Sequence, residues 1–311
     1  MMLLMATRVL LGVSEGVHVP MMSQLIKTWF PLEERARANS IFVSGLFLAV
    51  ILSPIMLVPL MTEFGWRMGF VLIALFGLLL SLPLVAWLVR DTPQQDRSVG
   101  AQELAFIAAG RERELGQENA QLSWRELFSM PRFLLLTAIG IINNVVALGF
   151  SSWLPTYFTS NRGIPFEDIT YLIAVPYSFS LLGIGLWAWL GDKFNIRASL
   201  AAVGFAGAAI LIYLALQSDS LAVVMVCFSL GVFFISAYNA CEFAMIQRIV
   251  PLEKMAPSMG VYNGCTSIIG GGLGPVIVSP IIAQGGPFWL VSAIALLNAA
   301  LLLWAWRILR Y

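Results

Sequence analysis

The chain has 311 residues, of which 59% are hydrophobic and 11% are charged, and its mean hydropathy is +0.85. This is far more apolar surface than one water-soluble core can bury, so the composition excludes an ordinary soluble domain. The net charge of +1 and the lack of a long basic tract give no sign of a nucleic-acid partner. Runs of about 20 mostly apolar residues recur between short charged breaks, which predicts an all-α polytopic membrane protein.

Nine membrane-spanning helices are expected. The first three cover residues 3–28, 40–62 and 67–90, and a polar segment containing an amphipathic helix near residues 102–116 follows them. Six further spans are expected at residues 132–158, 168–190, 197–216, 221–246, 257–283 and 287–308. The sequence therefore predicts a three-span part (1–90), a central linker (91–131) and a six-helix half (132–311).

Lysine and arginine gather in the loops on one side of this predicted bundle. The linker and its borders contribute six arginines, whereas the loops of the other side hold only Arg67 and Arg162. Because basic loops remain in the cytoplasm, the linker and the C-terminus are predicted to be cytoplasmic and Met1 external, in the inner (plasma) membrane. A first helix that starts outside predicts that further helices precede Met1.

Two ionisable residues lie inside the first predicted span. Arg8 and Glu15 are seven positions apart, about two helical turns, so they share one helix face, with Gly12 between them. Charged side chains in a membrane usually face a protein interior or a watery cavity. Arg8 is therefore a candidate to bind an anionic substrate, and Glu15 is a candidate to exchange a proton. The alternatives are a structural ion pair, or an Arg8 that reaches the outer surface.

Two more residues are candidates for proton exchange. His18 lies three residues after Glu15 and is a hydrogen-bond partner or a second proton carrier, although a lone histidine is more often a packing residue. Glu242 lies in the seventh span beside Asn239, nearer the cytoplasmic end than the middle. A role in a cytoplasmic gate or at the membrane interface is an equal alternative for Glu242.

Amide and phenol side chains in the later spans are candidates for substrate binding. Asn143, Asn144 and Tyr157 lie in the fourth span and Tyr177 in the fifth. Hydrogen bonds between helices are an equally good explanation of such residues. The glycine run at residues 270–274 predicts a close approach between helices or a bend, and it lacks the strand and the Lys-Ser/Thr of a phosphate-binding loop.

The sequence gives little support to an enzyme. It contains no HExxH or CxxC motif and one histidine, so triad or metal chemistry is not expected. The three cysteines all lie within apolar segments and indicate neither disulfides nor a metal site. We therefore predict no cofactor and no metal.

Three stretches together resemble a known family. Residues 8–20 (RVLLGVSEGVHVP), 29–38 (WFPLEERARA) and 65–67 (GWR) resemble helices four to six of the major facilitator superfamily, specifically its anion:cation symporter family. The nine predicted spans then look like helices four to twelve, without the first three. The resemblance implies proton-coupled symport of a small organic anion, such as a sugar acid or another carboxylate, by rocking of two halves in a monomer.

The resemblance also implies roles for particular residues. Arg8 and Glu15 match the positions that bind substrate and couple the proton, and Asn263 matches a helix-eleven asparagine that lines the site in some members. Residues 189–197 (WLGDKFNIR) are similar to the second-half copy of a cytoplasmic gating motif. This similarity implies gating roles for Asp192, Lys193 and Arg197.

Two departures and two alternatives remain. Ala188 and Asn195 stand where the gating motif usually has glycine. An exchanger of organophosphate for phosphate shares the fold but would be expected to have more cations in its cavity. A non-transporting membrane sensor of the same fold is also compatible with the sequence.

Overall fold

The computed structural model describes residues 2–115, 123–165, 169–283 and 289–309, and the elements formed in those ranges are all helical. Eight helical stretches among the described residues are long and apolar enough to cross a membrane. The eighth expected span, residues 257–283, is built from three shorter consecutive elements: α11 (Met255–Cys265), η7 (Thr266–Gly271) and α12 (Gly272–Ala283). The fold class predicted from the hydropathy pattern is therefore confirmed.

The first span is divided into two helices, which corrects the single helix expected over residues 3–28. α1 covers Met2–Glu15 and α2 covers His18–Trp29, with a turn at Gly16 and Val17. The cause is Pro20, which has no N–H to donate to Gly16 and whose ring crowds the carbonyl four residues earlier. The described side chains of α1 are exposed, whereas α2 packs against α11.

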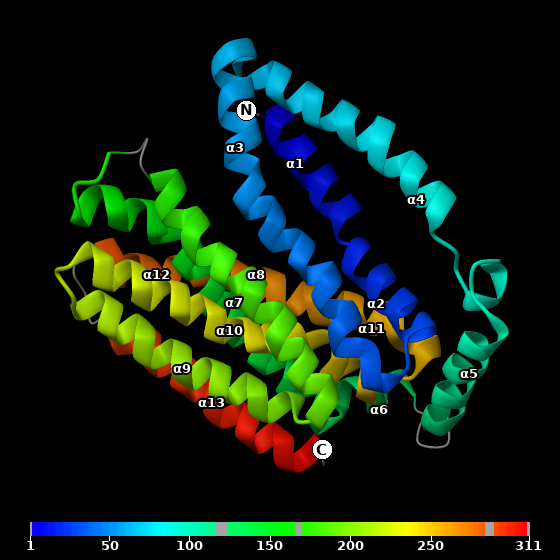
Figure 1. Ribbon diagram of the computed structural model, residues 1–311. Helices are drawn as coiled ribbons and strands as arrows, with labels where there is room; N and C mark the ends of the chain where they lie inside the picture. Colours follow the sequence, from blue (N-terminus) through cyan, green and yellow to red (C-terminus); the bar gives the residue numbers. More distant parts are fainter. Residues whose placement is uncertain (1, 116–122, 166–168, 284–288, 310–311) are drawn as a thin grey trace.

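A kink separates the second and third spans. α3 runs from Arg35 to Phe76, and its backbone leaves helical geometry at Gly65, where φ is +76°. Only glycine adopts this conformation without strain. The chain then continues through η2 (Gly77–Ser81) into α4 (Leu82–Leu88), which runs away from the bundle (Figure 1). Apart from Gly69, the described residues of the third span, 63–88, are exposed or only partly buried.

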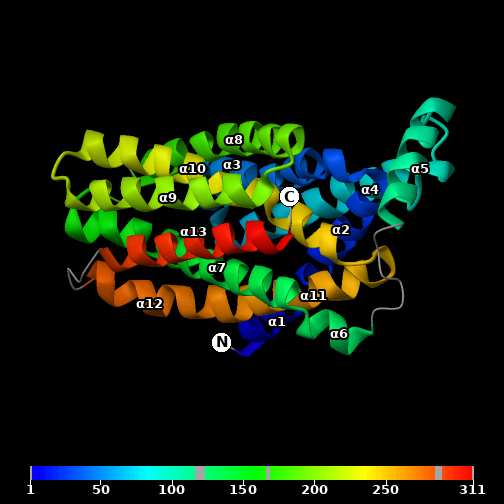
Figure 2. The same cartoon turned by 90° about the horizontal axis from the view of Figure 1, so that it is seen from below.

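The linker contains two short helices and one longer helix. η3 covers Pro93–Gln95, α5 covers Ala101–Leu115 and α6 covers Trp124–Ser129. α5 agrees with the amphipathic helix expected near residues 102–116. It lies beside α2 at one end of the molecule (Figures 1 and 2), which we call the linker end.

The remaining helices form a packed bundle (Figure 2). They are α7 (Pro131–Thr156), η4 (Tyr157–Asn161), α8 (Ile169–Phe194), α9 (Arg197–Gln217), α10 (Leu221–Ile249), η6 (Leu252–Lys254), α11, η7, α12 and α13 (Trp289–Leu309). α10 is central, because it packs against α7, α8 and α9 and also against α2 and α3. The interface between the bundle and the first group of helices, α2 and α3, therefore lies along α10.

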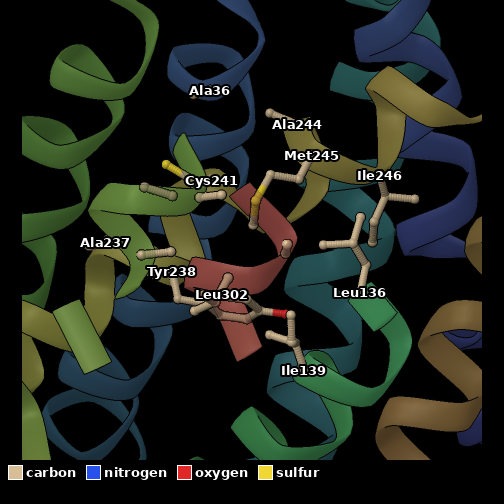
Figure 3. Packing of buried hydrophobic residues seen from close by; sticks show 14 of the residues in the cluster. Ala36, Leu136, Ile139, Ala237, Tyr238, Cys241, Ala244, Met245, Ile246 and Leu302 are labelled. Atoms are coloured by element: carbon tan, nitrogen blue, oxygen red, sulfur yellow. The ribbon is translucent and has the colours of Figure 1, made fainter. Parts of the chain in front are cut away.

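The core lies within this bundle. Figure 3 shows Tyr238, Cys241 and Met245 of α10 packed among Ile139 of α7 and Leu302 of α13, and each of these five side chains is at most 1% exposed. Helices approach closely where glycine faces a neighbour: a Cβ added at Gly270 would lie 2.8 Å from the Asn144 Cβ. The expected close approach at the glycine run is confirmed, and its π-helical turn, η7, widens the helix there.

Candidate functional site

A small cavity lies where α3 meets the bundle. Its volume is about 90 Å³, and its lining includes Phe47 of α3, Tyr177 of α8 and Asn239 of α10. The rings of Phe47 and Tyr177 are 6.2 Å apart, so an aromatic contact joins the two groups of helices across it. Sites for small molecules usually have volumes of about 300 Å³ or more, so this cavity is smaller than most such sites.

Two predicted asparagines lie on α7 close to this cavity. Asn143 is one turn from Val146 and Ala147, which line the cavity, and its side chain is 4% exposed. Its Oδ1 atom has no hydrogen-bond partner among the described residues. Asn144 instead packs against Gly270. A buried, unpaired amide oxygen is costly unless a donor reaches it, which makes Asn143 the stronger candidate of the two.

Below the cavity, toward the linker end, a carboxyl group lies among hydroxyls. Tyr262 of α11 donates a hydrogen bond to Oε1 of Glu242, and the hydroxyls of Tyr238 and Tyr262 are 3.1 Å apart. Both tyrosines are 1% exposed. The sequence singled out Glu242 but not its two tyrosine partners, which lie 4 residues before it and 20 residues after it in the chain.

At the linker end, Asp192 joins the bundle to α3. Its carboxylate accepts hydrogen bonds from the backbone N–H groups of Ala36 (3.1 Å) and Arg37 (2.9 Å) at the start of α3. It also accepts from Nη2 of Arg197 at 2.7 Å. An anion at a helix N-terminus is favoured because the first N–H groups lack partners and the helix dipole is positive there.

The other residues of the predicted gating motif have separate contacts. Arg197 is 0% exposed and also donates to the carbonyl oxygen of Leu32 at 2.7 Å, so it holds the loop before α3. Lys193 is exposed, with Nζ 4.5 Å from the Trp189 ring centroid. Asn195, which replaces a usual glycine, has φ of +52°, a conformation that asparagine tolerates better than most residues.

A second contact at the linker end was missed by the sequence analysis. Lys27, at the end of α2, is 1% exposed and donates to the carbonyl oxygens of Gln247 (2.9 Å) and Val250 at the end of α10. A cation at a helix C-terminus is the counterpart of the Asp192 contact. The side chains of Asn39 and Gln247 are also paired, at 2.8 Å. We call the Asp192 and Lys27 contacts together the latch.

The linker helix braces the same region. Arg35 donates to both carboxylate oxygens of Glu114 on α5, at 2.7 and 2.8 Å, and Arg113 forms an ion pair with Glu33 at 3.0 Å. Gly110 faces Pro31, where an added Cβ would lie 2.6 Å from the Pro31 Cβ. The loop between α2 and α3 is therefore held by both the linker and the bundle.

The predicted pair in the first span is only partly described. The side chain of Arg8 lies outside the described residues, and Glu15 is the exposed last residue of α1. His18 begins α2, and its ring lies 5.3 Å from that of Phe42 on α3. A contact between Arg8 and Glu15 therefore stays a prediction.

Two further candidates lie apart from the cavity lining. The Tyr157 hydroxyl accepts from Nε and Nη2 of Arg162, at 3.0 and 2.8 Å, and Arg162 also donates to the carbonyl oxygen of Asp219. These contacts tie loops together at the end of the bundle opposite the latch. Asn263 is partly buried near the end of α11, and its carbonyl oxygen accepts from the hydroxyl of Thr266.

The hydropathy, the helical bundle and the latch define a class of protein: a multi-pass membrane protein in which two groups of helices meet around a cavity. A sequence profile described as the Major Facilitator Superfamily matches residues 1–275. The chain therefore belongs to the Major Facilitator Superfamily.

The similar curated proteins are named as transporters. A probable chloroplastic anion transporter 2 of Oryza sativa subsp. japonica is 29% identical, over 86% of this chain and 51% of its own length. A probable sulfoacetate transporter of Cupriavidus necator is 26% identical, over 92% and 67%. A D-galactonate transporter of Escherichia coli O6:H1 is 24% identical, over 96% and 73%. The chain thus spans about half of the first relative and about two thirds to three quarters of the others.

Proposed function

We propose that this chain belongs to a secondary transporter that moves a small organic anion, such as a sugar acid or another carboxylate, together with a proton. The observation that carries the proposal is the cavity between α3 and the bundle, together with the latch contacts that join the two groups of helices at the linker end. A cavity that is closed by breakable polar contacts is what alternating access requires. The names of the relatives support an anion as the substrate.

We assign the latch to the cytoplasmic side, because the basic loops gather there. Opening it would separate Asp192 from the start of α3 and Lys27 from the end of α10. Arg8 is proposed to bind the anion and Glu15 to exchange the proton, with Tyr177, Asn143, Asn144 and Asn263 as further contacts. The proposed location is the inner membrane, and the proposed working unit is a monomer.

Uptake by the full chain in lipid vesicles tests this function. We expect labelled galactonate or a hexuronate to accumulate under an imposed proton gradient, and the accumulation to collapse when an ionophore dissipates that gradient. Arg8→Ala and Glu15→Gln should both abolish accumulation, whereas Glu63→Gln, an exposed carboxylate beside the Gly65 kink, should not.

The same assay separates the alternatives. Gradient-independent exchange of external organophosphate for internal phosphate would replace the symporter with an exchanger. Anion binding without any uptake would indicate a sensor. Full activity of both Arg8→Ala and Glu15→Gln would overturn the assignment of the first span as the binding site.

A further inference from the structure

Along its axis, α10 carries three polar side chains at successive levels between the cavity and the latch. Asn239 lines the cavity, Glu242 follows three residues later, and the Gln247 side chain pairs with Asn39 beside Lys27. At 1.5 Å per residue, Glu242 is about 4.5 Å along the helix axis from Asn239 and about 7.5 Å from Gln247. Along the axis of α10, Glu242 therefore lies between the cavity, where a substrate would bind, and the latch.

Tyr262 holds this carboxyl group in place from a second helix. Its hydroxyl donates to Glu242, and the Tyr238 hydroxyl, 3.1 Å from that of Tyr262, fixes the tyrosine in turn. Figure 3 shows Tyr238 among the core residues, so this end of the cluster is anchored in the bundle. Buried hydroxyls are almost always hydrogen-bonded, and these two are satisfied by each other and by the carboxyl group.

α7 has a glycine, Gly140, where it faces Tyr262, and the missing side chain leaves room for the Tyr262 hydroxyl. A Cβ added at Gly140 would collide with the Tyr262 hydroxyl and would lie 2.7 Å from Cγ2 of Thr266. Gly264, two residues after Tyr262, has no atom within 4 Å of an added Cβ. Gly140 is thus specifically adapted to Tyr262, and Gly264 provides a matched position without that constraint.

Several of the described charged side chains near the linker end have other partners. Asp192 pairs with Arg197 next to Gly191, where the Cys241 thiol, on the residue before Glu242, also lies. The ring of His18 on α2 contacts that of Phe42 on α3, which in turn contacts the Phe243 ring on α10. Among the other ionisable groups on α2, α3 and α8 at this end, Lys27 contacts backbone carbonyls and Arg35 contacts Glu114. Arg37 contacts Glu34 and Asp192, and Lys193 contacts aromatic rings.

Glu242 therefore has hydroxyl partners and no cation among the described residues. An ionised carboxylate in an apolar environment is stable only with a cation, a metal ion or water beside it. A carboxyl group without a cation can be neutral while the helices are closed and can ionise when water reaches it. The water would enter from the cavity or through the opened latch.

We propose that Glu242 is a proton-binding site of the transport cycle and that Tyr262 is the residue that positions it between the cavity and the latch. In this step a proton passes from water in the cavity to a Glu242 carboxylate oxygen, and it leaves to water when the latch opens. The inference rests on the proposed function and adds to it a site in the C-terminal half, separate from Glu15.

Infrared difference spectroscopy of the purified full chain in lipid tests the site without any need for transport. As the pH is raised, the wild-type protein should lose a carboxylic-acid C=O band that is absent in Glu242→Gln. The band should shift in Tyr262→Phe and Gly140→Ala, because both disturb the hydrogen bond, and it should be unchanged in Gly264→Ala. A titrating band that persists unchanged in Glu242→Gln would overturn the proposal.

Transport separates a failure of this proposal from a failure of the proposed function. Proton-driven accumulation by Glu242→Gln should fall to the level of protein-free vesicles, while exchange of labelled for unlabelled anion falls much less. Accumulation equal to wild type in that variant overturns the role of Glu242 and leaves the symporter intact. No transport by the wild type overturns the proposed function, and the infrared titration then decides alone whether Glu242 binds a proton.

Discussion

Asp192 connects three groups at the latch, and its side chain is only 3% exposed. Replacement by asparagine would leave the buried Arg197 guanidinium without its carboxylate, and breaking a buried ion pair from one side typically costs about 3–5 kcal/mol. We therefore expect Asp192→Asn to melt at a clearly lower temperature than wild type in a detergent thermal-shift assay.

The neighbouring Lys193 provides the control for that variant. It is exposed and contacts only aromatic rings in the described contacts, so Lys193→Gln should change the stability by no more than about 0.5 kcal/mol. Equal melting temperatures for Asp192→Asn and wild type would show that the latch does not contribute to the folded state. Comparing the two variants thus distinguishes the contribution of a buried residue from that of an exposed neighbour in the same motif.

At the scale of elements, packing of η7 against α7 depends on Gly270. A Cβ at this position would lie 3.2 Å from the Ile141 carbonyl carbon and 2.8 Å from the Asn144 Cβ. We expect Gly270→Ala to destabilise the protein by about 1–3 kcal/mol, the usual range for overpacking. Gly272→Ala, with no atom within 4 Å, should have nearly wild-type stability in the same thermal melt. A ranking in the opposite order would contradict the helix contact.

α6 begins with a capping box that makes its stability depend on pH. The Ser123 hydroxyl accepts from the Glu126 N–H at 3.2 Å, and the Glu126 carboxylate accepts from the Ser123 N–H at 2.7 Å. Hydrogen bonds from the side chain and backbone of Ser123 hold the pKa of Glu126 below its usual range. A pKa that is lower in the folded state stabilises the helix above the unfolded pKa, and this contribution is lost as the pH falls through the folded pKa.

Hydrogen exchange of the α6 amides measures this effect. After correction for intrinsic rates, we expect protection to decrease in acid in the wild type, and Ser123→Ala to increase exchange about fivefold at neutral pH, as for loss of a typical cap. Ser129→Ala, whose hydroxyl donates to the Arg125 carbonyl oxygen at the other end of α6, should not reproduce that change. Acid-independent protection in the wild type would exclude the capping effect.

At the scale of the whole molecule, the latch should control access to Cys241. This thiol is 0% exposed and lies beneath Gly191, close to the Asp192 contacts. Lys27→Met removes the cation from the end of α10, so we expect faster reaction of Cys241 with a small thiol reagent, in a protein where Cys227 and Cys265 are replaced by serine. Mass spectrometry of the labelled protein measures the rate.

Lys254→Met is the matched control for the labelling experiment. Lys254 also lies at the linker end, in the loop between α10 and α11. Its Nζ is 5.4 Å from the centroid of the Trp124 ring. Its replacement should leave the labelling rate of Cys241 unchanged. If both lysine variants labelled at the wild-type rate, Lys27 would not hold the two groups of helices together.

Several features of this protein were determined by the sequence alone. Apolar runs of about 20 residues require helices in a membrane, because each backbone group must be satisfied within its own segment. The glycine run marked the close approach between helices, since glycine has no side chain to keep neighbouring helices apart. Glu242 was identifiable because charged groups are rare inside apolar spans, whereas Asp192 was identified by the resemblance of residues 189–197 to a gating motif.

The tertiary structure alone decided which residues meet. Lys27 and Gln247 are 220 positions apart, and Tyr262 reaches Glu242 from another helix, so no local spacing could pair them. The break at Pro20 was overlooked because the hydropathy of residues 3–28 is continuous, although a proline interrupts helical hydrogen bonds whatever its neighbours. Hydropathy fixes which segments cross the membrane, whereas the partner of each polar side chain depends on how the helices pack.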